Sequence, residues 1–248
     1  MPNLVAVILA AGKGVRMKSD LPKVFHEILG EPMLTYVLNT VKKLSPLKIM
    51  VVVGHQRQLI IDYYKDWPVE FVIQEQQLGT GHAVMQVEPQ LKDFSGNVLV
   101  LAGDVPLLSE KTLRELIGFH IKNNASATDL TAVLEDAGNY GRIIRKENGE
   151  IIKIVERKDA SPEELKIREI NTGTFCFDKE ALFDTLKKVR ADNAQKEYYL
   201  TDTIEILKNT GLPVFACRAE NPSETLGINT KEELIRIEKF LLSNKLTT

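Results

Sequence analysis

The stretch Leu4-Val5-Ala6-Val7-Ile8-Leu9-Ala10-Ala11-Gly12-Lys13-Gly14-Val15-Arg16-Met17 decides the fold. Residues 4–9 form an unbroken apolar run, which is typical of a strand buried on both faces of a parallel sheet. A glycine-rich loop follows this run directly. Ligands of open α/β sheets bind beyond the carboxyl ends of the strands. The sequence therefore predicts a ligand-binding loop at the end of the first strand.

The same alternation of strand and helix continues through the first half of the chain. Further strand-like runs lie at 47–53, 69–73 and 98–102, and helix-like segments at 33–44, 56–65, 80–87 and 109–122. In the second half, strands are predicted at 130–134, 142–145, 151–156, 170–177 and 214–217, and helices at 179–189, 198–208 and 231–242. Asn148-Gly149 is a strong hairpin signal. We predict an α/β fold: a doubly wound, mostly parallel Rossmann-like sheet with helices on both faces and a smaller antiparallel β insertion.

Composition and charge limit the possible partners. The 248 residues include 32 basic and 34 acidic side chains, a net charge of −2. That balance favours neither nucleic acid nor an anionic membrane as a partner. The two cysteines, Cys176 and Cys217, lie in apolar runs without metal-ligand spacing, as expected of reduced core residues in a cytoplasmic protein. The N-terminus has no leader pattern, and we expect one domain over residues 1–229 followed by a helix over 230–248.

The glycine-rich loop matches neither of two common phosphate-binding motifs. A dinucleotide fingerprint needs a third glycine where Met17 stands, and a Walker A loop needs Gly-Lys followed by Ser or Thr. Small residues nevertheless let backbone N–H groups approach phosphates, and Arg16 adds a planar fork for phosphate oxygens. The alternative is a simple strand-to-helix turn.

Lys23 follows in Leu21-Pro22-Lys23. Proline fixes its own φ and restricts the residue before it, so this lysine stands on a stiff turn near the glycine loop. It could place a point charge on a phosphate. The alternative is a solvated surface lysine.

The motif Leu-Ala-Ala-Gly-x-Gly-x-Arg-Met at 9–17, with Leu-Pro-Lys at 21–23, resembles the signature of sugar-phosphate nucleotidyltransferases. Val24-Phe25-His26 narrows the resemblance to the N-terminal uridylyltransferase domain of bacterial N-acetylglucosamine-1-phosphate uridyltransferases. Further matches run along nearly the whole chain. The resemblance implies the nucleotide-diphospho-sugar transferase fold and a Mg²⁺-dependent reaction of UTP with N-acetylglucosamine 1-phosphate. The products would be pyrophosphate and UDP-N-acetylglucosamine, a precursor of peptidoglycan and lipopolysaccharide.

The stretch from Gln74 to Ala83 follows the third strand and is predicted to bind the base. A glutamine amide can pair with a base edge that presents a donor and an acceptor, and Gly79 lets backbone come close. The resemblance implies that Gln74 and Gly79 recognise uracil and that Thr80 lies near the sugar. His82 is expected to be structural, and the alternative for the whole stretch is a polar loop with a helix cap. The residues predicted to hold the nucleotide are Leu9, Ala10, Ala11, Gly12, Gly14, Gln74, Gly79 and Thr80.

Asp104 follows the fourth strand in Gly103-Asp104. A single carboxylate there suits Mg²⁺, which takes few protein ligands beside phosphates and water. The resemblance implies that Asn229 shares the ion. On residue type alone, Asp104 could equally cap a turn and Asn229 could be a helix N-cap.

Gly141, Glu156 and Asn171 match the positions that hold the sugar in the resembled family, and Ala102 and Gly103 are expected beside them. Residues 192–202 resemble the N-acetylglucosamine branch. Three positions depart from the pattern and leave the sugar open: Ala102, Lys196 and the pair Thr230-Lys231.

The chain ends at Thr248, without the left-handed β-helix that acetylates glucosamine 1-phosphate and builds the trimer in the resembled family. We therefore expect no acetyltransferase activity, and the oligomeric state stays open. The expected chemistry is in-line attack of the sugar phosphate on the α-phosphorus, with Arg16 and Lys23 as catalytic residues. The same residues bear on three alternatives. A different sugar phosphate or nucleotide, such as glucose 1-phosphate or dTTP, stays open as a substrate. The stretch from Gln74 to Ala83 disfavours a cytidylyltransferase. Arg16, Lys23 and Asp104 together disfavour a non-catalytic regulatory module.

Overall fold

A mixed sheet forms the centre of the molecule, and the computed structural model describes residues 3–245. Its main path runs β11-β7-β10-β6-β1-β4-β5. These strands are β1 Leu4–Ala10, β4 Lys48–Val53, β5 Glu70–Ile73, β6 Asn97–Ala102, β7 Ala127–Val133, β10 Glu169–Asp178 and β11 Val214–Arg218. On this path β10 pairs antiparallel with both neighbours, while the other pairs are parallel. The predicted mostly parallel sheet is confirmed.

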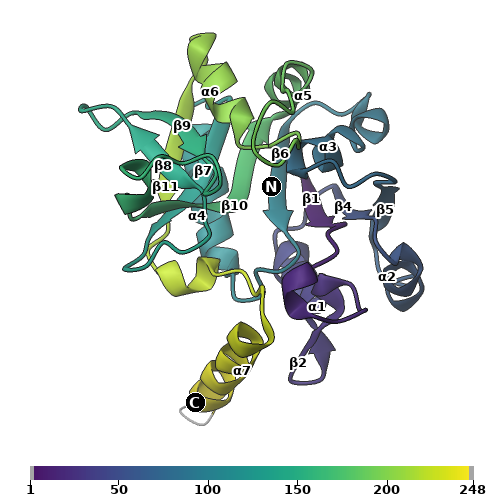
Figure 1. Cartoon of the computed structure of the whole chain (residues 1–248). Helices are drawn as coiled ribbons and strands as arrows, with labels where there is room; N and C mark the ends of the chain where they lie inside the picture. Colours follow the sequence, from purple (N-terminus) through teal and green to yellow (C-terminus); the bar gives the residue numbers. More distant parts are fainter. Residues whose placement is uncertain (1–2, 246–248) are drawn as a thin grey trace.

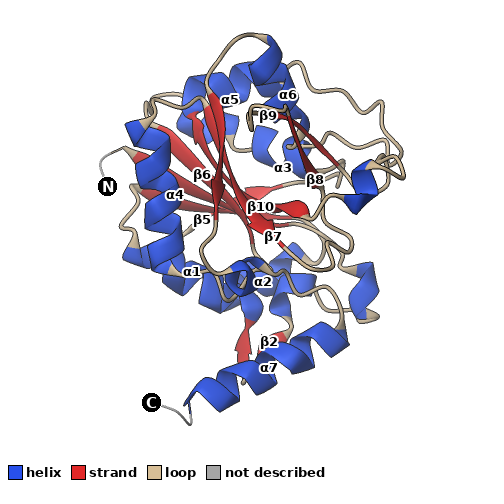
Figure 2. Cartoon of the chain, turned by 90° about the vertical axis from the view of Figure 1, so that its left-hand side faces the viewer, coloured by secondary structure: helices blue, strands red, loops and turns tan. Residues whose placement is uncertain are grey.

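Helices cover both faces of this sheet (Figures 1 and 2). One face packs against α1 Met33–Lys43, α2 Arg57–Tyr63 and α4 Glu110–Lys122. The other packs against α3 Thr80–Met85, α5 Lys179–Leu186, α6 Asp202–Asn209 and the antiparallel hairpin of β8 Arg142–Arg145 and β9 Ile151–Val155. β1 is buried on both faces, with Val5 and Val7 in one core and Ala6 and Ile8 in the other. This double burial explains why its sequence is apolar throughout.

A second small hairpin was not predicted. It joins β2 Glu27–Ile28 to β3 Glu31–Pro32, just before α1. The last helix, α7 Lys231–Lys245, packs on this hairpin through Leu234, Ile237 and Leu241, and extends away from the sheet (Figure 1). The β2–β3 hairpin and α7, which are far apart in the sequence, thus pack together beside the site described below.

Two elements begin three or more residues away from where the sequence predicted them. The helix expected from Tyr198 begins at Asp202, because the preceding backbone is used elsewhere: Tyr198 O accepts from Gly81 N, and Leu200 N donates to Thr80 Oγ1. The strand expected from Leu130 already begins at Ala127, where it pairs with β10 and β11.

The topology gathers loops at one edge of the sheet. The parallel strands β1, β4, β5, β6, β7 and β11 all end at this edge. β10 runs the other way, so its first residues extend past the carboxyl end of β6. The last residues of these strands and the loops after them carry most of the predicted site residues, as expected for an open α/β sheet.

Candidate active site

The glycine-rich loop is shaped by its contact with Lys23. Gly14 has φ +63°, a conformation that side chains with a Cβ rarely adopt. A Cβ on Gly14 would lie 2.5 Å from Lys23 Cβ, so the loop and the lysine segment touch only because residue 14 is glycine. Two short 3₁₀ turns, Val15–Met17 and Lys23–Phe25, carry Arg16 and Lys23. Around Gly12, by contrast, a Cβ would meet no atom within 4 Å, which leaves its backbone open to a ligand.

Gly54, at the end of β4, brings the glycine loop and the base stretch together. A Cβ at this position would lie 2.7 Å from the amide nitrogen of Gln77 and 3.0 Å from the Ala11 carbonyl. The next backbone N–H, of His55, donates to that carbonyl at 3.2 Å. The sequence analysis predicted a strand over 47–53 and gave the glycine after it no role, so the packing of Gly54 was missed.

Four predicted residues converge at the ends of β1, β6 and β11. Lys23 Nζ forms an ion pair with Asp104 Oδ2 and donates to Asn229 Oδ1 at 2.6 Å. Arg16 Nη2 donates to the same Asn229 oxygen at 2.8 Å. The side chains of Lys23 and Asp104 are only 15% and 17% exposed. Two cationic side chains and two side-chain oxygens thus meet in one partly buried cluster.

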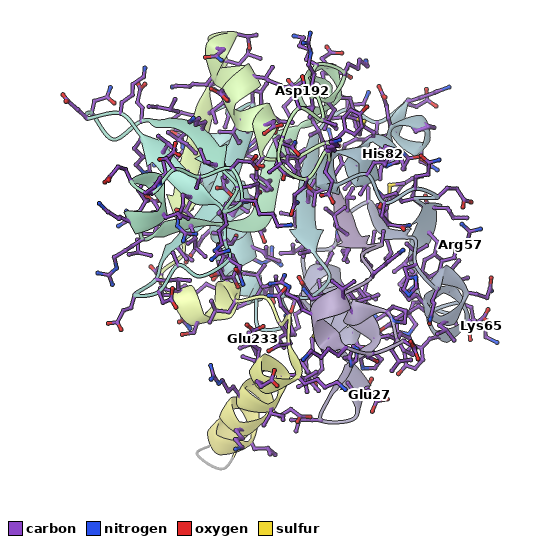
Figure 3. The ribbon with its side chains drawn as sticks, in the orientation of Figure 1. Glu27, Arg57, Lys65, His82, Asp192 and Glu233 are labelled. Carbon is purple, nitrogen blue, oxygen red and sulfur yellow. The ribbon has the colours of Figure 1, made fainter. Side chains whose placement is uncertain are left out.

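The backbone around Asn229 is held to Asp104 and to α7. Ile228 N donates to the Asp104 carbonyl at 3.0 Å, and a Cβ on Gly227 would stand 3.6 Å from Asp104 Oδ1. Glu233, in the first turn of α7, accepts from the N–H of Asn229 at 2.6 Å (Figure 3). Asn229 is therefore not the N-cap of α7, which was the alternative that its residue type left open.

Thr230 is the N-cap of α7. Its hydroxyl accepts from Glu233 N, and Glu233 accepts from Thr230 N, each at 3.2 Å. This reciprocal pair is a capping box, and the pattern Thr-x-x-Glu at 230–233 could have indicated it. The side chain of Asn229 is consequently free to face Lys23.

The cluster fits a magnesium ion. Asp104 Oδ2 and Asn229 Oδ1 both contact one ammonium group, so the two oxygens point at a common positive centre. Within residues 3–245 there is no group of three or more His, Cys, Asp or Glu that could hold a metal. One carboxylate and one amide oxygen, completed by phosphate oxygens and water, is a set that Mg²⁺ accepts.

The predicted base stretch is ordered around Gln74, which is 3% exposed. Gln74 Nε2 donates to the Gly79 carbonyl at 3.1 Å and lies 3.0 Å from His82 Nδ1. Gly79 has φ +105°, and a Cβ there would lie 2.6 Å from the Tyr198 carbonyl. Thr80 uses its hydroxyl to accept from the backbone of residue 200, a structural role beside the one predicted.

The residues predicted to hold the sugar lie next to one another in the structure. Asn171 N donates to the Gly141 carbonyl at 3.0 Å, and a Cβ on Gly141 would lie 3.5 Å from Glu156 Oε2. Glu156 Oε1 accepts from the Thr201 hydroxyl at 3.2 Å. Burial raises the pKa of Glu156, and the neighbouring Asp202 adds to the effect. Thr201 was missed, because the sequence analysis placed it inside a helix over 198–208, whereas it precedes α6.

The remaining predicted residues lie at the ends of β1 and β6. Gly103 N donates to the Leu9 carbonyl at 2.9 Å, and a Cβ on Gly103 would meet Val24 at 3.1 Å. Ala102 pairs with Leu9 in the β1–β6 register. Ala10 is buried at the end of β1.

Tyr140 links the sugar residues to the metal residues. Its hydroxyl accepts from Gly227 N at 2.8 Å, two residues before Asn229, while its own chain continues directly into Gly141. Burial raises the pKa of Tyr140, so the hydroxyl stays protonated at neutral pH. Nothing in the sequence indicated this contact across 87 residues.

A model of the MobA-like NTP transferase domain matches residues 6–201. The chain belongs to this family. The predicted resemblance to bacterial uridyltransferases is confirmed by two relatives, both named bifunctional protein GlmU. The Pelotomaculum thermopropionicum protein is 51% identical over 239 residues, 96% of this chain and 52% of the relative. The Streptococcus agalactiae protein is 49% identical over 236 residues, 95% of this chain and 51% of the relative. The chain thus spans about half the length of the curated relatives it matches.

A solved structure from Bacillus anthracis, assigned as a glucose-1-phosphate thymidylyltransferase, has the same fold. It superposes with a TM-score of 0.73 at 18% identity, covering 96% of this chain and 94% of the other. The predicted fold class is confirmed, and the family makes this chain a nucleotidyltransferase. Across residues 3–245, no helix is both long and apolar enough to cross a membrane.

Proposed function

We propose that this chain is a Mg²⁺-dependent uridylyltransferase that joins UTP and N-acetylglucosamine 1-phosphate, forming UDP-N-acetylglucosamine and pyrophosphate. The relatives named GlmU support this choice of substrates within the nucleotidyltransferases. The observation that carries the proposal is the meeting of Lys23, Asp104 and Asn229 beside Arg16.

The chemistry needs charge neutralisation more than proton transfer. A sugar 1-phosphate has a second pKa of about 6, so its attacking oxygen is already ionised at neutral pH and no general base is required. Pyrophosphate leaves with its negative charge, and Arg16 and Lys23 would hold the β- and γ-phosphates. Mg²⁺, held by Asp104 and Asn229, would supply further charge neutralisation between the phosphates. Catalysis would rest on positioning and preorganised charge.

The sugar moiety would lie against Gly141, Glu156 and Asn171. A carboxylate and an amide can accept from or donate to sugar hydroxyls and an acetamide, and Gly141 lets backbone come close. Tyr140 joins this group to the segment that carries Asn229, so one rigid unit would position both substrates. Two free cysteines, Cys176 and Cys217, support the cytoplasm as the location within this proposal.

The test is pyrophosphate release from UTP with N-acetylglucosamine 1-phosphate, in Mg²⁺ and in EDTA. Parallel reactions contain glucose 1-phosphate in place of the amino sugar, or dTTP in place of UTP. Release that needs Mg²⁺ and prefers the first pair supports the proposal. Release only with another pair would move the chain to a different substrate within the same reaction class. Binding of UTP without release from any pair would contradict the proposed activity.

A further inference from the structure

We propose that His82 is a positioning residue that fixes the hydrogen-bonding direction of Gln74 and thereby the base selectivity of the nucleotide site. The inference rests on the proposed function, in which Gln74 meets the base. It assigns a role to a histidine whose sequence context indicated only a structural one.

The orientation of the Gln74 amide follows from two partners. A carbonyl oxygen can only accept, so the group 3.1 Å from Gly79 O must be the NH₂ of Gln74. The second partner is His82 Nδ1, at 3.0 Å from the same nitrogen. The two amide hydrogens are therefore both used inside the protein.

The tautomer of His82 follows from the same geometry. Since the Gln74 nitrogen donates, Nδ1 accepts and the ring hydrogen lies on Nε2. The nitrogen of the Gln86 amide lies 3.3 Å from Nε2 and donates to the His82 carbonyl at 3.1 Å, so Gln86 fixes the backbone beside the ring and is not an acceptor for the Nε2 hydrogen. Tyr198 packs near the His82 ring, at a centroid distance of 6.2 Å, and its backbone carbonyl accepts from Gly81 N at 2.8 Å. His82 lies on α3 (Figure 3), and Gln74, Gln86 and Tyr198 all lie close to its ring.

The consequence lies at the other end of the amide. In the described part of the chain, no donor contacts Gln74 Oε1, and this oxygen is what Gln74 has left to offer a ligand. An acceptor held in this place selects a base edge that carries a ring N–H, as uracil does at N3. Cytosine has an unprotonated acceptor at N3. A glutamine free to turn its amide would meet either base equally well.

Two substitutions separate orientation from packing. His82→Asn places an acceptor oxygen on Cγ, where histidine carries Nδ1, whereas His82→Leu fills a similar volume without any acceptor. Steady-state constants for UTP and CTP are measured with both variants, together with the affinities of UTP and CTP by calorimetry. Melting temperatures show whether each variant is folded.

We expect His82→Leu to raise KM for UTP about tenfold with kcat changed less than about threefold, and to lower the preference for UTP over CTP about tenfold, the size of one lost orienting hydrogen bond. His82→Asn should keep both values within about threefold of the native protein. An unchanged preference in folded His82→Leu would overturn the inference, as would equal losses in the two variants.

The calorimetric affinities distinguish a failure of this inference from a failure of the proposed function. If the native chain binds UTP more tightly than CTP but releases no pyrophosphate, the proposed activity fails while the role of His82 is still measured. If the native chain binds both nucleotides equally, the role of His82 in selectivity is refuted directly.

Discussion

Nζ of Lys23 lies 2.6 Å from the side-chain oxygen of Asn229, although 206 residues separate the two in the sequence. Lys23 follows β1 and Asn229 follows β11, and the strands β7, β10 and β6 lie between β11 and β1 in the sheet. Their contact closes the site across the ends of the strands between them. The segments that follow these strands therefore hold the charged cluster together, and substitutions in them test this.

Asp104→Asn should lower kcat by about 10²–10³, the usual effect of removing one group that stabilises transition-state charge. The amide keeps an acceptor for Lys23, so the melting temperature should stay within a few degrees. The measurement is pyrophosphate release over a range of Mg²⁺ concentrations. Glu220→Gln is the matched control, since Glu220 pairs with an exposed lysine, Lys111, and should leave the rate unchanged. Near-native turnover of Asp104→Asn at ordinary Mg²⁺ would refute the metal assignment.

Gly14→Ala should destabilise the fold and lower activity together. The left-handed backbone costs a residue with Cβ about 1–2 kcal/mol. The new methyl would also displace Lys23, because its carbon would lie 2.5 Å from Lys23 Cβ. Urea unfolding and turnover measure the two effects.

Gly118→Ala is the control for that substitution. Gly118 lies in α4, and a Cβ there meets no atom within 4 Å. This change should stabilise the protein by about 0.5–1 kcal/mol, because alanine in a helix interior loses less conformational entropy on folding than glycine. If both alanine variants behaved alike, the close approach of Gly14 to Lys23 would have no consequence.

The sequence predicted the elements of the sheet better than their contacts. The apolar run of β1 and the helix expected from residue 109 are local patterns and were found; Ser109 is the N-cap of that helix and accepts from Thr112 N. The start of α6 was misplaced because residues 198–200 bind the Gly79–Gly81 turn, a long-range contact that outweighs local helix propensity.

The site shows the same division. The loops that carry Gly14 and Lys23 were found from the sequence, because glycine and proline themselves indicate strained or stiff backbone. The nearness of Asn229 to Asp104 came from family resemblance and not from spacing. The contacts of His82 and Tyr140 depend on how distant loops meet, and no local pattern encodes that.

Asp129 should make stability fall as pH rises. Both of its carboxylate oxygens are buried without a hydrogen-bond partner among the described residues. Burial raises the pKa of Asp129 well above its ordinary 3.8, and nearby Glu169 adds to this. The folded state therefore favours the protonated form. Its contribution is fully present below the ordinary pKa and is progressively lost as pH rises toward the folded-state value.

Asp129→Val and Asp129→Asn test this dependence by urea unfolding at pH 5 and pH 8. Valine suits a strand and removes the unpartnered group, so it should raise the free energy of unfolding at pH 8 by about 1–3 kcal/mol and by less at pH 5. Asparagine keeps a polar group but cannot titrate, so its stability relative to the native protein should rise with pH. An equal difference at both pH values for both variants would show that Asp129 does not titrate as described.

Tyr140→Phe should raise the Mg²⁺ concentration that gives half-maximal rate. The lost hydroxyl accepts from Gly227 N at 2.8 Å, and Gly227 leads into Asn229. A hydrogen bond contributes about 0.5–1.5 kcal/mol, so the shift should be about three- to tenfold, with KM for the sugar phosphate rising as well because Gly141 follows Tyr140. Tyr64→Phe is the control, since that hydroxyl shares a hydrogen bond with Thr35 Oγ1 at 2.8 Å, between α1 and the end of α2. If the two variants required Mg²⁺ equally, Tyr140 would not connect the sugar residues to the metal residues.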